Sequence, residues 1–176
     1  MTQVNEFIKV IGEFDISSLL EEYHRLENNL GWLENNFLGK QCSLQSREGE
    51  EPFISGTGSL PLGSDIKQFH ILHELFNDTV FKDLITEYKM YRTRFMWVNP
   101  RSCYRPHKDD SPRIHFPLVT NNLARFYFPE LTTNHMTHLE AGKVYWVDTT
   151  RIHSFINFGD SRRLHLVGAI DNDTHF

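Results

Sequence analysis

The residues best suited to chemistry in this chain are two histidines and one carboxylate, which lie in two short segments. His107 and Asp109 are two residues apart, so on an extended strand both side chains leave the same face. His153 follows 44 residues after Asp109. Two imidazoles and one carboxylate on one face of a metal hold Fe(II) and leave positions open for other ligands. The sequence therefore predicts a metal site in which His107, Asp109 and His153 are also the catalytic residues.

An arginine follows in a segment that alternates like a strand. Arg163 lies ten residues after His153. A guanidinium binds a carboxylate through two parallel hydrogen bonds, so Arg163 can hold the far carboxylate of a diacid that lies on the metal. The four residues together indicate an oxygenase rather than a general metal-binding protein.

Size and composition are those of one globular domain, which we expect to span residues 1–176. The chain is 39% hydrophobic and has 14 phenylalanines, enough for one sizeable core. Its two cysteines form no disulfide framework, which predicts reduced thiols in a cytoplasmic protein. No apolar segment approaches a membrane span. The net charge is −5 and no basic stripe is visible, so we expect neither a nucleic-acid nor a membrane partner.

Residues 1–89 are expected to be mainly helical, with one long loop. Residues 7–14 are predicted as a short strand and residues 15–29 as a helix, in which Ser18 and Glu21 form a capping-box pattern. Two more helices are predicted, over 64–76 and 79–90. Residues 39–63 lack clear periodicity and are predicted as a loop with one strand, our candidate for a lid over the site.

Residues 90–171 are expected to form the catalytic core. Alternating apolar residues and turn signals predict strands over 91–98, 114–120, 124–128, 143–147, 153–158 and 164–170. Short strands at this spacing point to an antiparallel sandwich or barrel. The fold class predicted is α+β, with N-terminal helices that buttress one sheet.

The order of the motifs resembles the Fe(II)/2-oxoglutarate-dependent dioxygenases. The resemblance is strongest to their aspartyl/asparaginyl β-hydroxylase-like branch, which includes the proline cis-hydroxylases. It covers about residues 90–171, and we recognise nothing in residues 1–89. The segments that carry it are Pro112–Leu118, Leu139–Gly142, Trp146–Asp148, and His153 with Asn157 and Arg163–Val167.

The resemblance implies a double-stranded β-helix (jelly-roll) core and the cofactors Fe(II), 2-oxoglutarate and O₂. His107, Asp109 and His153 would bind iron, and Arg163 would pair with the distal carboxylate of 2-oxoglutarate. Arg113 and His115 correspond to a pair that contacts this cosubstrate; on a strand, the two share one face. Peptidyl members of the branch lack the carboxylate ligand, so Asp109 favours the proline-hydroxylase-like members and argues against a halogenase.

The expected reaction is hydroxylation of a C–H bond with release of succinate and CO₂. The expected substrate is an amino acid, either free (proline, for example) or as a side chain in a peptide. Candidates for recognising its charge are Arg94, Arg105 and Arg151, and candidates for orienting the imidazoles are Asn157 and Asp148. Three alternatives stay open: a cupin-like non-oxidative metal enzyme, a binding module without turnover, and a nucleic-acid demethylase of the same superfamily. The oligomeric state is not predicted.

Overall fold

The computed structural model of the protein describes residues 6–35, 37–61, 63–133, 136–174 and 176. The elements in chain order are β1 (Ile8–Glu13), α1 (Ile16–Leu26), η1 (Glu27–Asn29), β2 (Leu33–Asn35), β3 (Gly39–Ser43), β4 (Gln45–Ser46), η2 (Ile66–Gln68), β5 (Ile71–Leu72), η3 (Glu74–Phe76), α2 (Val80–Glu87), β6 (Tyr91–Val98), β7 (Ser102–Cys103), β8 (Arg113–Val119), β9 (Ala124–Tyr127), β10 (Met136–Thr137), β11 (Lys143–Val147), β12 (Ser154–Asn157) and β13 (Arg163–Ala169). Within these described residues, no helix has the length and hydrophobicity that a transmembrane span requires.

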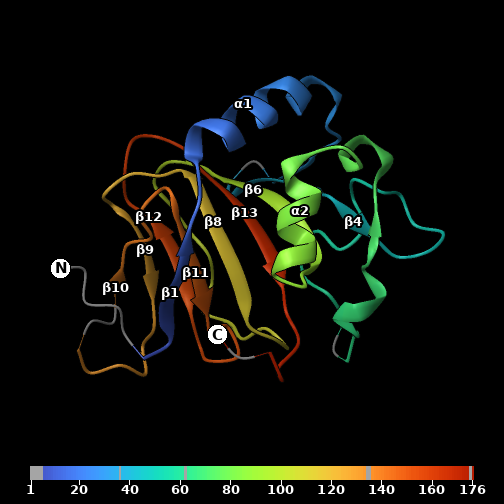
Figure 1. Ribbon diagram of the computed structural model, residues 1–176. Coiled ribbons are helices and arrows are strands. Elements are labelled where there is room, and N and C mark those ends of the chain that lie inside the picture. The colour runs from blue at the N-terminus through green and yellow to red at the C-terminus, as the bar shows by residue number, and fades with distance from the viewer. Residues whose placement is uncertain (1–5, 36, 62, 134–135, 175) are drawn as a thin grey trace.

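Two antiparallel sheets make up most of the molecule (Figure 1). The larger has the strand order β1-β11-β8-β13-β6-β3-β2 and the smaller β10-β9-β12-β7. One apolar cluster contains Ile8 and Val147 from the larger sheet and Phe126 and Phe155 from the smaller, so the two sheets pack face to face. This arrangement of two antiparallel sheets, with few helices, is jelly-roll-like.

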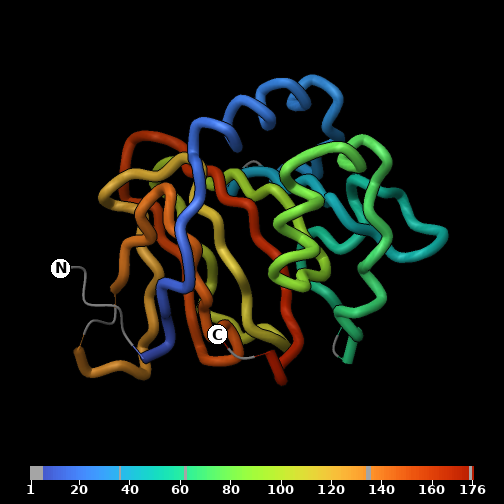
Figure 2. Tube along the Cα trace, viewed as in Figure 1, coloured from blue at the N-terminus to red at the C-terminus, as the bar shows by residue number. Residues whose placement is uncertain are grey.

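Strands from both halves of the chain share the larger sheet. β1, near the N-terminus, pairs with β11, as Figure 2 shows where the blue and orange segments run side by side. β3 pairs with β6, and β2 continues the sheet beyond β3. Residues 1–89 therefore supply both edges of the larger sheet, where we had expected mainly helix.

The outer face of the larger sheet is covered by the two α-helices and the turns near them. Phe95 of β6 is fully buried and its ring contacts Tyr23 of α1 and Phe81 of α2 at centroid distances of 5.1 and 5.0 Å. Phe116 of β8 joins the same cluster. Along each strand, alternate residues point to this apolar layer and to the space between the sheets.

The six strands predicted for residues 90–171 are present, within one or two residues of their expected ends. The helix predicted over 64–76 is wrong. This segment forms two short 3₁₀ turns around β5, whose two residues pair with β4. Helical periodicity was a local signal, and pairing with another part of the chain overrode it. The cap of α1 also differs: Asp15, not Ser18, accepts the first backbone N–H groups, from Ser17 and Ser18.

Replacing Phe95 with alanine should lower the free energy of unfolding by about 3–5 kcal/mol, since the ring contacts both helices and leaves a cavity. Chemical denaturation of the metal-free protein measures this change. Phe37→Ala is the matched control, because Phe37 is 87% exposed and its loss should change stability by no more than about 0.5 kcal/mol. Equal effects of the two substitutions would contradict the packing described above.

Candidate functional site

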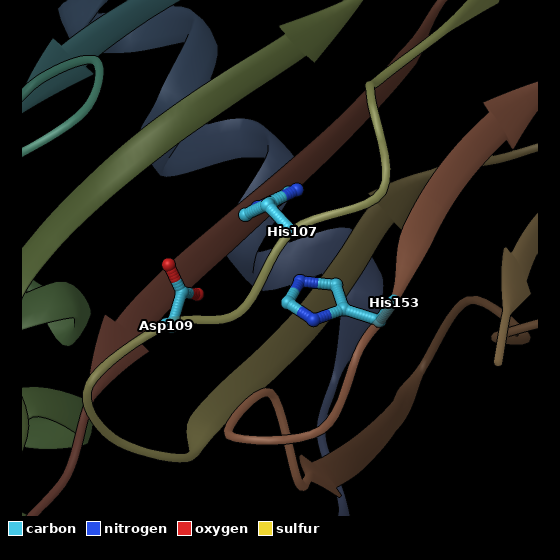
Figure 3. Close-up of side chains that lie close together, drawn as sticks. All are labelled: His107, Asp109 and His153. Atoms are coloured by element: carbon cyan, nitrogen blue, oxygen red, sulfur yellow. The ribbon is translucent and has the colours of Figure 1, made fainter. Parts of the chain in front are cut away.

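The three predicted ligands come together at one end of the space between the sheets. His107 and Asp109 lie on the segment that leads into β8, and His153 directly precedes β12. His107 and His153 form an isolated antiparallel bridge, in which each backbone N–H donates to the other's carbonyl at 2.9 Å. The Asp109 N–H donates to the Thr149 carbonyl at 2.8 Å. One potential ligand atom from each of the three side chains lies within 4.8 Å of the other two (Figure 3).

Backbone carbonyls fix the orientation of both imidazoles. Nδ1 of His107 is 2.7 Å from the carbonyl oxygen of Arg105, and Nδ1 of His153 is 2.9 Å from that of Arg151. Each Nδ1–H donates to its carbonyl, which leaves Nε2 as the lone-pair nitrogen available to a metal.

Asn157 and Asp148 do not orient the imidazoles, contrary to our expectation. The Asn157 amide donates to the carbonyls of Asn99 and Ser161, and Asp148 accepts from Thr150. The carbonyls that take their place belong to residues two positions before each histidine, and no side-chain pattern marks them.

Asp109 is suited to bind a cation because it is held ionised. Burial raises the pKa of its carboxyl, but Arg113 and Arg94 more than offset this, so the pKa is lowered overall. Arg113 Nε is 3.2 Å from Asp109 Oδ2. His107 is exposed and His153 is buried, so the cluster opens to solvent on the His107 side.

Strand register brings a second set of side chains to the same interior. Arg163 and His165 alternate along β13, and Arg113 and His115 along β8. Val167 of β13 is the Cα partner of His115, and Ala169 is that of Arg113. Partners across a ladder share a face, so the expected pairing of Arg113 with His115 on one face agrees with the structure. The ring centroids of His115 and Phe126 are 5.1 Å apart. Phe126 belongs to the smaller sheet, and its ring centroid is also 6.2 Å from that of His153.

Arg163 is the most unusual of these residues, because it is a buried cation without a buried anion. It is 3% exposed, and its guanidinium carbon lies 3.5 Å from the centre of the Phe155 ring. In the described part of the chain no carboxylate is within 4.0 Å of the guanidinium, and its Nε has no hydrogen-bond partner. Its Nη2 is within hydrogen-bonding distance of Nδ1 of His165. Burial lowers its pKa well below the ordinary value. Such a group is costly unless an anion completes it.

His165 and His115 share this need for a partner. Their Nδ1 atoms are 3.4 Å apart, and the Nε2 atom of each is buried without a hydrogen-bond partner. Burial and the charge of Arg163 lower both pKa values well below the ordinary value. His165 was not among the predicted site residues; its position two residues after Arg163 on a strand was the available signal.

Three other candidate residues lie away from this interior. Arg105 and Arg151 are exposed, and Arg151 pairs with Asp148 at 3.5 Å. His135 and His138 are three residues apart, a spacing that can imitate a zinc-binding pair. Nδ1 of His138 lies 3.0 Å from the Ala124 carbonyl oxygen, and His135 lies outside the described residues.

Comparisons with known proteins identify a family and a fold. The family described as aspartyl/asparaginyl β-hydroxylase matches residues 53–172, more than half of the chain. None of the curated proteins matches significantly. Among solved structures, an oxidoreductase of the 2OG-Fe(II) oxygenase family from Burkholderia pseudomallei superposes with a TM-score of 0.58 at 14% identity, over 93% of this chain and 83% of that one. The structure of IDO from Bacillus thuringiensis gives a TM-score of 0.51 at 12% identity, over 96% and 92%. These two similarities are of fold.

Proposed function

Because the chain belongs to the aspartyl/asparaginyl β-hydroxylase family, we propose that His107, Asp109 and His153 hold the catalytic Fe(II). The protein is a 2-oxoglutarate-dependent dioxygenase, and its cofactors are Fe(II), 2-oxoglutarate and O₂. Family membership decides against a cupin-like non-oxidative enzyme and against a binding module. What supports the metal assignment is the donor set: two Nε2 atoms freed by Nδ1 hydrogen bonds, and one ionised carboxylate.

Arg163 binds the distal carboxylate of 2-oxoglutarate, and this buried guanidinium without an anion is the observation that carries the proposal. His165 contacts Arg163 and lies beside His115, and the unpartnered Nε2 atoms of both histidines can donate to or accept from the bound cosubstrate. Arg113 has two roles: it holds Asp109 at 3.2 Å and offers positive charge to the cosubstrate end nearest the metal.

Bound Fe(II) and 2-oxoglutarate supply the oxidising chemistry, which hydroxylates a C–H bond and releases succinate and CO₂. The chain's own residues set the geometry. The carbonyls of Arg105 and Arg151 keep the imidazoles from turning, and Phe126 and Phe155 exclude water from the side of Arg163. The substrate is an amino acid, free or as a side chain in a peptide.

The proposal extends to the rest of the chain. Residues 1–176 form one domain, because strands from both halves share one sheet, and α1 and α2 support the sheet face opposite the site. Cys42 and Cys103 are free thiols, which fits a cytoplasmic location.

Anaerobic titration tests this function directly. The metal-free protein, given Fe(II) and then 2-oxoglutarate, should develop a visible metal-to-ligand charge-transfer band that His153→Ala abolishes. Succinate release with free amino acids and with short peptides then identifies the substrate. Bound iron without a band would refute the cosubstrate assignment.

A further inference from the structure

A second buried arginine on the interior face has no anion, and the metal and 2-oxoglutarate do not account for it. Arg94 of β6 is 7% exposed. Among the described residues no carboxylate lies within 4.0 Å of it, and its Nε is buried without a hydrogen-bond partner. Its Nη1 donates to the Gly56 carbonyl at 2.8 Å. A carbonyl satisfies one N–H group but does not neutralise the charge.

Register places Arg94 in the same row of side chains as His115. Arg94 is the Cα partner of Val167, and Val167 is that of His115. Two strand spacings separate Arg94 from His115, or about 10 Å between their Cα atoms. Arg94 therefore faces the interior that holds the proposed cosubstrate pocket. Burial and the nearby charge of Arg113 lower its pKa to about 10, while Asp109 acts in the opposite direction.

The charges of the interior do not balance without a further anion. Arg113 is paired with Asp109. Under the proposed function, the two carboxylates of 2-oxoglutarate would be taken by Arg163 and by the metal. Arg92 and Arg94 are the buried guanidiniums that remain. Arg92 makes two hydrogen bonds to loop carbonyls, whereas the Nε of Arg94 has no partner, so Arg94 is the one open to an anion. Like charges this close repel each other in a low-dielectric interior.

The 39–63 segment holds the Arg94 side chain in a fixed position. Gly56 has φ +73°, and a Cβ there would lie 3.1 Å from Cγ of Arg92 and 2.9 Å from the Phe69 ring, so only glycine lets this backbone approach. Arg92 binds the same loop through two hydrogen bonds. Its Nε donates to the Gly56 carbonyl at 2.6 Å and its Nη2 to the Gly58 carbonyl at 2.7 Å. A fixed donor binds its ligand with little loss of side-chain entropy.

We propose that Arg94 is the anchor for a carboxylate of the substrate, and that the enzyme therefore acts on a carboxylate-bearing molecule with its Gly56 loop as one wall of the pocket. This inference rests on the proposed function. It narrows the substrate class, because an amide or ester in place of that carboxylate would leave Arg94 buried and unpaired.

The test uses trifluoroacetate as a carboxylate probe whose ¹⁹F relaxation reports its distance from a paramagnetic metal. The full-length protein is loaded with Mn(II) and saturating 2-oxoglutarate, so that the Arg163 pocket is occupied. We expect saturable relaxation of the probe in the wild type, displaced by acetate and not by acetamide. Arg94→Gln should weaken probe binding at least tenfold, and Arg94→Lys should restore part of it.

Two control variants separate an anchor from a loop support. Arg92→Gln removes two hydrogen bonds to the same loop and should weaken probe binding much less than Arg94→Gln does, because the anchoring guanidinium is kept. Arg162→Gln removes an exposed charge and should have no effect. Equal loss in Arg92→Gln and Arg94→Gln, or unchanged binding in Arg94→Gln, would overturn the proposal. The Fe(II)·2-oxoglutarate band, recorded on every variant, confirms folding. Its absence in the wild type would instead be a failure of the proposed function.

Discussion

Replacing Arg163 with methionine should raise the 2-oxoglutarate concentration needed for half-saturation by about 100-fold or more. Leaving one partner of a buried charge pair unmatched costs about 3–5 kcal/mol, and each 1.4 kcal/mol is about a factor of ten in affinity. Methionine is unbranched and fills much of the space beside the Phe155 ring. The anaerobic band titration, or calorimetry with Mn(II) in place of Fe(II), measures the change.

Arg163→Met, which weakens 2-oxoglutarate binding, should not weaken the fold of the protein when metal and 2-oxoglutarate are both absent. Arg163 is buried without an anion, so methionine should leave the metal-free, cosubstrate-free protein at least as stable as the wild type. The wild type should gain thermal stability from Mn(II) and 2-oxoglutarate together, whereas the variant should gain from Mn(II) alone. Arg163→Lys keeps the charge but loses the planar fork, and an intermediate affinity is expected. A methionine variant that binds 2-oxoglutarate within about threefold of wild type would rule out this pocket.

The sequence predicted which polar side chains lie close together or share a face better than it predicted the N-terminal elements around them. His107 and Asp109 share a strand-like spacing, and alternation along β8 and β13 placed Arg113 with His115 and brought Arg163 onto the interior face. These signals are local and survive in the folded protein because strand period alone sets which face a side chain takes.

What the sequence could not predict depends on contacts between distant segments. β5 pairs with β4 in a segment for which a helix was predicted. No local sequence pattern indicates this strand pairing. The imidazole orientation is set by backbone carbonyls, which every residue carries. The hydrogen bond that holds Arg94 is made to the Gly56 carbonyl, which lies 38 residues away along the chain. Local sequence around Arg94 therefore does not predict it.

Replacing Asp109 with alanine should weaken divalent metal binding by at least about 100-fold, since it removes one of the three proposed ligands. Even loss of a group that hydrogen-bonds to a ligand typically costs about 10–100-fold. Substrate-dependent succinate release should fall in parallel. Calorimetric titration with Mn(II), which carboxylate-rich sites accept, measures affinity without turnover. Asp110→Ala is the matched control, because Asp110 is an exposed neighbouring carboxylate outside the three-residue cluster. The Mn(II) affinity of this variant should stay within about twofold of wild type.

Asp109→Ala also leaves the Arg113 guanidinium, which is buried, without its carboxylate. The metal-free variant should therefore unfold at a lower denaturant concentration than wild type, by an amount that solvent reduces because Asp109 itself is partly exposed. Asp109→Ala/Arg113→Met, which removes both charges, should regain stability but not metal affinity. If the double variant regained metal binding, the carboxylate would be a partner for Arg113 alone, and the metal would have to be held by other groups.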